Sequence, residues 1–214
     1  MRMKTLIISK NAKGAIAAAL VYGLSSLGIA QTVPVQNQDV SQEQTPEKES
    51  QRNTEQDSLS KDSQILNVLV NLNNSEILTG RLAKQKAKND EVRAFADEMV
   101  DQHSQANQAI EKLKKVLRIN TESTDFSEHF KKAAAEQMAK LKMVRIQLFD
   151  SHYIEAQVVT LKQAMKMIDE NLIPKAKNPK LILLLNQAKE IMHKQADEAT
   201  KLQQNIQSQT IEKQ

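Results

Sequence analysis

The chain has 214 residues without cysteine or tryptophan, and only 3% of its residues are aromatic. The lack of cysteine excludes disulfide bonds and thiol chemistry, and the shortage of aromatic side chains argues against surfaces that stack nucleic-acid bases or sugars. The formal charge is +4, but the first thirty residues hold four basic residues and no acidic one, so the rest is neutral and predicts no nucleic-acid partner.

Residues 1–30 have the pattern of a secretory signal peptide. A basic start precedes a long apolar run that ends in Gly28-Ile29-Ala30, with small residues at the two positions that a signal peptidase reads. Cleavage there would make Gln31 the first residue of the exported chain. The alternative is an uncleaved anchor, because the run lies at the short end of a membrane span. We favour cleavage because serines and glycines dilute the run.

Residues 31–62 are predicted to be a disordered polar linker. They are rich in Gln, Ser, Glu, Asp and Thr and have almost no large apolar residue, so they cannot bury enough surface to offset the entropy of ordering. From residue 63 to the end, the chain is rich in Ala, Leu, Lys, Gln and Glu at helical spacing, without strand-like alternation. We therefore expect one helical domain over residues 63–214.

Five helices are predicted in this domain, at about 63–88, 91–118, 126–144, 146–173 and 179–208. Asp90 is expected to cap the second helix, and Asp125 or Ser127 the third. Pro179 suits the first position of the last helix. Long helices with short links predict an all-α, antiparallel four-helix bundle, with the shorter helix as a cap or as the start of the fourth.

The first helix has a carboxylate in the middle of an apolar face. At helical spacing this face consists of Ile65, Leu69, Leu72, Glu76, Gly80, Ala83 and Ala87. A buried carboxylate either has a partner or stays protonated at some energetic cost. Gly80 is the only glycine after residue 30, so we expect another element to approach the helix closely one turn after Glu76.

Two further helices carry polar residues on apolar seams. His103 lies in step with the apolar residues of the second helix, and Tyr153 and Gln157 do so in the fourth. Glu76 and His103 are about equally far from the turn at 89–90, so we expect them to meet at the same height of an antiparallel pair. Such a contact would raise the pKa of the histidine and lower that of the glutamate.

One interpretation of these residues is a metal site. A carboxylate-bridged di-iron centre takes a Glu from each of two helices and Glu-x-x-His from each of the other two. Glu190 and His193 have that spacing, but they lie off the apolar seam of the last helix. The ligand set is therefore incomplete, and its candidates are Glu76, His103 and His193.

The other interpretation is a buried polar core without a cofactor. Glu76 and His103 would then hydrogen-bond with Tyr153 or Gln157 and fix the register of the helices. We favour this interpretation and predict no cofactor, with a metal ion as the alternative.

A series of short motifs extends from about Ile65 to Asn205. They are Ser75-Glu76-Ile77 with Gly80 and Leu82-Ala83, Val92 to Ala96, Met99-Val100 before His103, Phe149-Asp150 with Tyr153, and His193. In order and spacing they resemble the domain of unknown function DUF4142, a bacterial family whose members are labelled outer-membrane or periplasmic proteins. The resemblance implies an exported protein with a ferritin-like helical bundle, and no established activity.

The chain departs from the pattern of this family at three positions. Gln102 precedes His103 where the family has an aspartate, and Leu161 stands where it tends to have a histidine. Ile146 replaces a glycine before Phe149. The missing histidine weakens the case for a metal site in this chain.

We therefore expect an exported protein of the bacterial cell envelope, with a non-enzymatic binding, structural or stress-related role. The alternative is a metal-binding, ferritin-like protein that uses inward-facing Glu and His residues. Expected partners are the envelope or a second copy of the chain through its helix faces, and no small ligand can be named.

Overall fold

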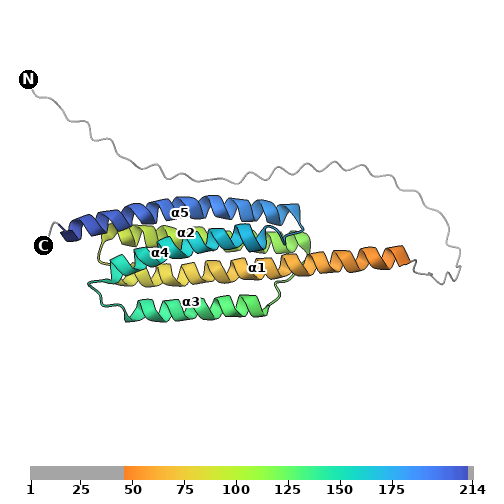
Figure 1. Cartoon of the computed structure of the whole chain (residues 1–214), viewed down its shortest axis with the longest axis horizontal. Coiled ribbons are helices and arrows are strands. Elements are labelled where there is room, and N and C mark those ends of the chain that lie inside the picture. The colour runs from red at the N-terminus through yellow and green to blue at the C-terminus, as the bar shows by residue number, and fades with distance from the viewer. Residues whose placement is uncertain (1–45, 212–214) are drawn as a thin grey trace, which may run out of the picture. The chain divides into compact units, whose positions relative to one another are not determined.

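The computed structural model describes residues 46–211 of the chain. They form α1 (Pro46–Lys86), α2 (Asp90–Leu117), α3 (Asp125–Met143), α4 (Phe149–Met167), the short π-helix η1 (Ile168–Leu172) and α5 (Pro179–Ile211) (Figure 1). This part of the chain contains no strand, so the prediction of an all-α domain is confirmed for it. The expected signal peptide and residues 31–45 of the expected linker lie outside the described residues.

Helix α1 is longer than predicted. It begins at Pro46 and not near residue 63, so residues 46–62 of the expected linker are helical. Proline suits the first helical position because its missing N–H would have no helical partner there. Residues 46–62 contain too few apolar side chains to fold as an isolated segment. As an extension of an existing helix they can be ordered, because each added residue forms one more backbone hydrogen bond. The packed part of α1 therefore supports its polar beginning.

Consecutive helices run in opposite directions, and four of them share one core (Figure 1). Helix α1 packs against α2 and α4, and α5 packs against the same two helices. Helix α3 lies outside this group and contacts mainly α1. The π-helix η1 continues α4 directly and packs against α5. Within residues 46–211, no helix combines the length and the apolar character that crossing a membrane requires.

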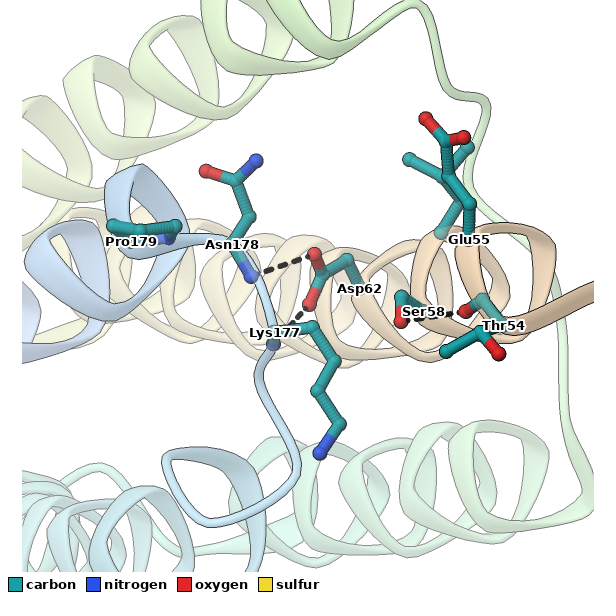
Figure 2. Close-up of a pocket in the computed structure, with 8 residues that line it drawn as sticks. Thr54, Glu55, Ser58, Asp62, Lys177, Asn178 and Pro179 are labelled. Carbon is teal, nitrogen blue, oxygen red and sulfur yellow. Dashed lines mark hydrogen bonds between the residues drawn. The ribbon is translucent and has the colours of Figure 1, made fainter. Parts of the chain in front are cut away.

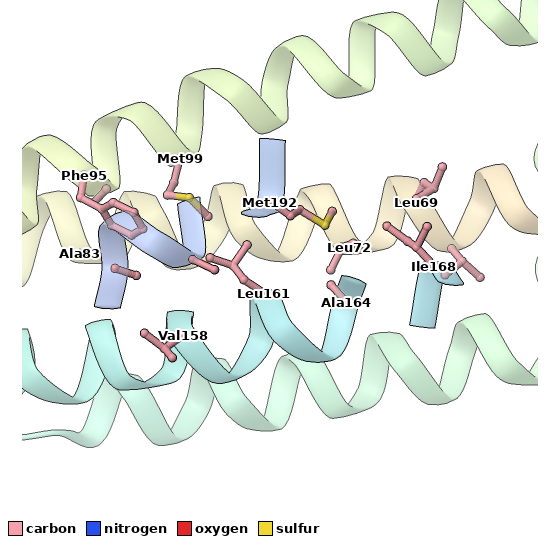
Figure 3. Packing of buried hydrophobic residues seen from close by; sticks show 14 of the residues in the cluster. Leu69, Leu72, Ala83, Phe95, Met99, Val158, Leu161, Ala164, Ile168 and Met192 are labelled. Atoms are coloured by element: carbon pink, nitrogen blue, oxygen red, sulfur yellow. The ribbon is translucent and has the colours of Figure 1, made fainter. Parts of the chain in front are cut away.

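The core consists of the apolar seams that the sequence predicts (Figure 3). Every residue of the predicted face of α1, from Ile65 to Ala87, is buried, Glu76 and Gly80 included. Helix α3 is less buried than the core helices, because Phe126 is 51% exposed and Leu141 is its only fully buried apolar residue. The reason is that α3 packs on the outside, where one neighbouring helix covers only part of its apolar face.

The helix ends differ from the predicted caps. Asn89, and not Asp90, caps α2, with its side-chain oxygen accepting hydrogen bonds from the N–H groups of Glu91 and Val92. Thr124 caps α3 in a reciprocal pair with Ser127. Asn89 directly precedes the predicted Asp90, and Thr124 directly precedes Asp125, one of the two residues predicted to cap α3, because the capping side chain must stand outside the first helical turn.

Helices α1 and α2 approach each other closely at Gly80, as expected. A Cβ atom on Gly80 would stand 2.8 Å from the Cγ2 of Val100 and 3.0 Å from the carbonyl oxygen of Ala96. These distances are shorter than van der Waals contact, so only glycine allows this separation of the two helices.

Two buried or half-buried carboxylates fix loops by accepting backbone hydrogen bonds. Asp150 at the start of α4 accepts from the N–H of Lys88 and, at 2.8 Å, from that of Asn89 in the α1–α2 turn. Asp62 of α1 accepts from the N–H groups of Lys177 and Asn178 just before α5 (Figure 2). Each carboxylate thereby ties one end of the helical core to a helix that is distant in sequence.

Candidate functional site

Five buried polar side chains from all four core helices form the candidate site, and we call them the polar layer. They are Glu76 of α1, His103 of α2, Tyr153 and Gln157 of α4, and Gln195 of α5. None is more than 4% exposed. They are buried because helical spacing places them on the same faces as the apolar seams, so packing of the seams carries them inward.

Glu76 is a buried acid that is stabilised in its neutral form. Burial raises its pKa from 4.5 to about 7, because the charged carboxylate loses its hydration. Side-chain hydrogen bonding from Gln157 and Thr79 acts in the opposite direction but does not outweigh burial. The Oε2 atom of Glu76 has no hydrogen-bond partner.

His103 is neutral, and the hydrogen bonds around it define its tautomer. Its Nδ1 lies 2.9 Å from the Oδ1 of Asn73, whose Nδ2 donates to the Oδ1 of Asn107. An amide oxygen can only accept, so Nδ1 carries the proton and Nε2 presents a lone pair. Burial lowers the pKa of His103 to about 4, a shift that Gln195 opposes in part. The Nε2 atom has no partner.

The predicted pairing of Glu76 with His103 does not set the charges of the site. The hydrogen bond of His103 goes to Asn73, one turn before Glu76, and the predicted pKa directions are wrong for both groups. Loss of hydration is the largest influence on each group, because it favours the neutral form of an acid and of a base alike.

Tyr153 closes the layer on the side of the α1–α2 turn. Its ring stacks on Phe149 at a centroid distance of 6.2 Å and meets Phe95 edge-on at 6.3 Å. Burial, and then the negative charge that Glu76 carries when it ionises, raise the pKa of Tyr153 well above its usual value. The hydroxyl therefore stays protonated, and it has no hydrogen-bond partner.

Gln195 is the member of the layer that sequence reasoning missed. The Nε2 of Gln195 donates to the Oε1 of Gln102 at 2.7 Å. The Oε1 of Gln195 has no hydrogen-bond partner. The signal was present, because Gln195 lies three residues after Met192 and four before Ala199, two buried apolar residues of the same helix. Gln102, which departs from the family pattern, is thus half of an α2–α5 contact.

The layer offers more unpaired acceptors than donors. Its partnerless atoms are Glu76 Oε2, His103 Nε2, Tyr153 Oη, Gln157 Oε1 and Gln195 Oε1. The two amide oxygens and the imidazole lone pair only accept, whereas the tyrosine hydroxyl and the protonated carboxyl of Glu76 can donate. No lysine or arginine belongs to the layer. With three acceptor-only atoms, the layer has an excess of acceptors that suits a hydrogen-bond donor.

The third metal candidate lies elsewhere. His193 is exposed on α5, and its Nδ1 stands 3.2 Å from the Oδ2 of Asp197 on the same helix. Glu190 is exposed as well, as expected from its position off the seam. Of the three candidates, the structure brings Glu76 and His103 into one layer and leaves His193 outside. No group of three or more His, Asp or Glu side chains within residues 46–211 is placed to hold a metal.

Two surface grooves flank the N-terminal part of α1, and neither is lined by the polar layer. The first, of about 510 Å³, lies between α1 and the segment before α5, and the second, of about 670 Å³, lies between α1 and the α2–α3 loop. Figure 2 shows the first groove, where both oxygens of Asp62 already accept backbone hydrogen bonds. Asp62 therefore has a structural task in this groove.

One protein family matches most of the chain. The domain of unknown function DUF4142 matches residues 44–202, which contain the whole polar layer. No curated protein and no solved structure matches the chain. The match covers α1 to α4 and most of α5, so the chain belongs to the DUF4142 family.

Proposed function

We propose that this protein is a non-enzymatic binding or structural protein of the bacterial cell envelope, with a stress-related role, built as a ferritin-like antiparallel four-helix bundle. Helices α1 and α5 each pack antiparallel against α2 and α4, and the shared core of these four helices supports this architecture. Helix α3, which packs outside them, is the additional short helix of the proposal.

The polar layer is the observation that carries the binding function. Leaving a buried polar atom without a partner costs about 1–3 kcal/mol, and apolar side chains of similar size would avoid that cost. The layer leaves five such atoms without a partner. A core that binds a ligand needs them, because the same atoms supply its contacts.

Export is supported by the sequence pattern of residues 1–30. Cell fractionation followed by mass spectrometry of the N-terminus tests it, and we expect an envelope fraction in which the chain begins at Gln31. Recovery of the chain in the cytoplasm with residues 1–30 intact would overturn this part of the proposal.

The absence of enzymatic activity is proposed because the layer has no nucleophile paired with a base. His103 is neutral, but its Nε2 is buried with no serine, threonine or lysine of the layer beside it. We expect the purified protein to consume neither ferrous iron nor peroxide catalytically. Multiple turnovers of either substrate would contradict the proposal.

A second candidate function is metal binding by Glu76 and His103. It is favoured by one specific observation, namely that each group presents a buried acceptor atom without a partner. A rise of the melting temperature with added metal, reversed by a chelator, would support it. Indifference of the melting temperature to both additions would exclude it.

The proposed partners are the envelope and a second copy of the chain. Several large apolar side chains are exposed on the outer faces, among them Leu78, Phe126 and Leu183 at 54%, 51% and 58%. Light scattering of the purified protein over a range of concentrations tests self-association, and a monomer at all concentrations would exclude it.

A further inference from the structure

The loop between α3 and α4 exposes apolar side chains at one end of the bundle (Figure 1). Met143, the last residue of α3, is 86% exposed, more than any other large apolar side chain in the described part of the chain. Leu148, the last residue before α4, is 41% exposed, and Val144 and Ile146 between them are half-buried. Single exposed apolar residues are common, but four within six consecutive residues make this loop a candidate interaction surface.

Contacts with the end of α1 hold this loop in place. The Nζ atom of Lys86 donates hydrogen bonds to the carbonyl oxygens of Lys142 and Val144, at 2.8 and 3.1 Å. The same ammonium group lies 5.0 Å from the ring centre of Phe149, the first residue of α4. The loop is therefore fixed at both of its ends, and its exposed side chains project from an ordered backbone.

Basic side chains surround the apolar loop. Four of them are exposed, one from the α1–α2 turn and three from the end of α3 and the loop itself: Lys88, Lys140, Lys142 and Arg145. The α1–α2 turn lies against the start of α4, because the N–H of Lys88 donates to the Oδ1 of Asp150 at 3.1 Å. Lys86, which contacts the loop directly, adds a fifth positive charge.

The acidic side chains at this end do not balance these charges. Residues 84–97 and 139–150 contain four acidic residues. Two of them already pair with neighbouring basic residues, in the ion pairs Asp90–Arg93 and Asp97–Lys84. The other two, Glu91 and Asp150, stand against the five basic residues around the loop, which leaves three positive charges in excess. This end of the bundle therefore combines an apolar loop with positive charge.

We propose that this end of the domain docks onto an anionic lipid surface through the α3–α4 loop. Met143 and Leu148 enter the headgroup region, and the surrounding basic side chains contact the lipid phosphates. The inference rests on the envelope location proposed above and names the partner there. Each basic residue near an anionic membrane strengthens binding about fivefold, and apolar side chains that enter the interface add to it. A second copy of the chain fits this surface poorly, because two identical patches would bring like charges together.

A polarity-sensitive dye on the loop tests this contact. Because the chain has no cysteine, Met143→Cys provides a single labelling position in the purified full-length protein. We expect its fluorescence to shift to the blue with vesicles that contain phosphatidylglycerol, and much less with vesicles of phosphatidylcholine alone. The control is the same dye at Leu183→Cys, an exposed position near the start of α5, at the other end of α4.

The two labelled positions separate docking through the loop from attachment through residues 1–30. An unchanged spectrum at Met143→Cys with anionic vesicles would overturn the proposal. An equal shift at Met143→Cys and Leu183→Cys, or an equal shift with both kinds of vesicle, would overturn it as well.

Matched charge variants test the basic residues. One variant removes three charges beside the loop by combining Lys140→Gln, Lys142→Gln and Arg145→Gln. The control removes three exposed lysines at the other end of α4 by combining Lys175→Gln, Lys177→Gln and Lys180→Gln. We expect the first variant to bind anionic vesicles at least about tenfold more weakly, and the control to keep the affinity of the wild type. Equal losses in both variants would refute the site. All six side chains are exposed, and circular dichroism verifies the fold.

Soluble polyglutamate tests the alternative that the surface recognises an acidic protein. A blue shift at Met143→Cys with polyglutamate equal to that with anionic vesicles would overturn the lipid assignment, and we expect none. Cell fractionation tests the envelope location independently. A chain recovered in the envelope fraction whose loop ignores anionic vesicles would overturn this inference alone and leave the proposed function in place.

Discussion

Replacing Glu76 by glutamine should make the stability of the metal-free protein depend on pH. Between pH 4.5 and 6.5 the folded protein has a protonated Glu76 and a neutral His103, because burial moves their pKa values to about 7 and about 4. The unfolded chain has both groups charged in this window, at their ordinary pKa values of 4.5 and 6.5. Each state thus holds one proton on the pair, and the two effects on stability cancel.

The substitution removes one side of this balance. In Glu76→Gln only His103 titrates, so below pH 6.5 the unfolded state binds one proton more than the folded state, and stability rises with pH. The slope is about 1.4 kcal/mol per pH unit, or about 3 kcal/mol over the window. His103→Gln exposes the opposite effect of Glu76, and stability should fall by about 3 kcal/mol as the pH rises from 4.5 to 7.

Urea unfolding followed by far-UV circular dichroism measures these profiles. Each variant is compared with the wild type at every pH in the presence of a chelator, so that the exposed acids common to all proteins cancel. His193→Gln is the control and should reproduce the wild-type profile. If the profile of Glu76→Gln runs parallel to that of the wild type, the two groups are not a compensating buried pair and the reasoning is refuted.

Three further substitutions test other parts of the core. Gly80→Ala should lower the free energy of unfolding by about 1–2 kcal/mol, because overpacking against Val100 outweighs the better helix propensity of alanine; denaturant unfolding that shows a gain would contradict the close approach. Asp150→Ala should destabilise by about 2 kcal/mol and speed hydrogen exchange of the Asn89 amide, and protection equal to that of the wild type would count against the anchor. Tyr153→Phe without metal should be neutral or stabilising by up to about 1 kcal/mol, since the lost hydroxyl has no partner; a loss above about 2 kcal/mol in thermal or urea unfolding would reveal a hydrogen bond.

The fold was predictable where apolar residues recur at helical spacing over many turns. The face of α1 from Ile65 to Ala87 is buried throughout, because one seam of that length has only one way to pack. The start of α1 at Pro46 was not predictable from local composition, since it depends on the packed turns that follow. The exposure of Phe126 is not predictable for a related reason, because the pattern of one helix does not say how many neighbours it has.

Most residues of the polar layer could be predicted from the sequence, but their hydrogen-bond partners could not. Counting from the α1–α2 turn identified Glu76 and His103 as buried residues of neighbouring helices. It could not identify Asn73 as the partner of the histidine, because that choice depends on side-chain rotamers and on the asparagine chain that continues to Asn107. Burial of Gln195 was not predictable from its residue type, because glutamine on a helix is most often exposed.

The energetics of the polar layer connect the proposed function to the fold. A buried polar atom without a hydrogen-bond partner costs about 1–3 kcal/mol, which is a large share of the net stability of a typical domain, about 5–15 kcal/mol. The long apolar seams of α1, α2, α4 and α5 can offset this cost only because the layer is uncharged, with Glu76 protonated and His103 neutral. An occupant that satisfies the same atoms would recover much of that free energy. The layer is therefore the part of the domain whose stability should respond most strongly to a bound ion.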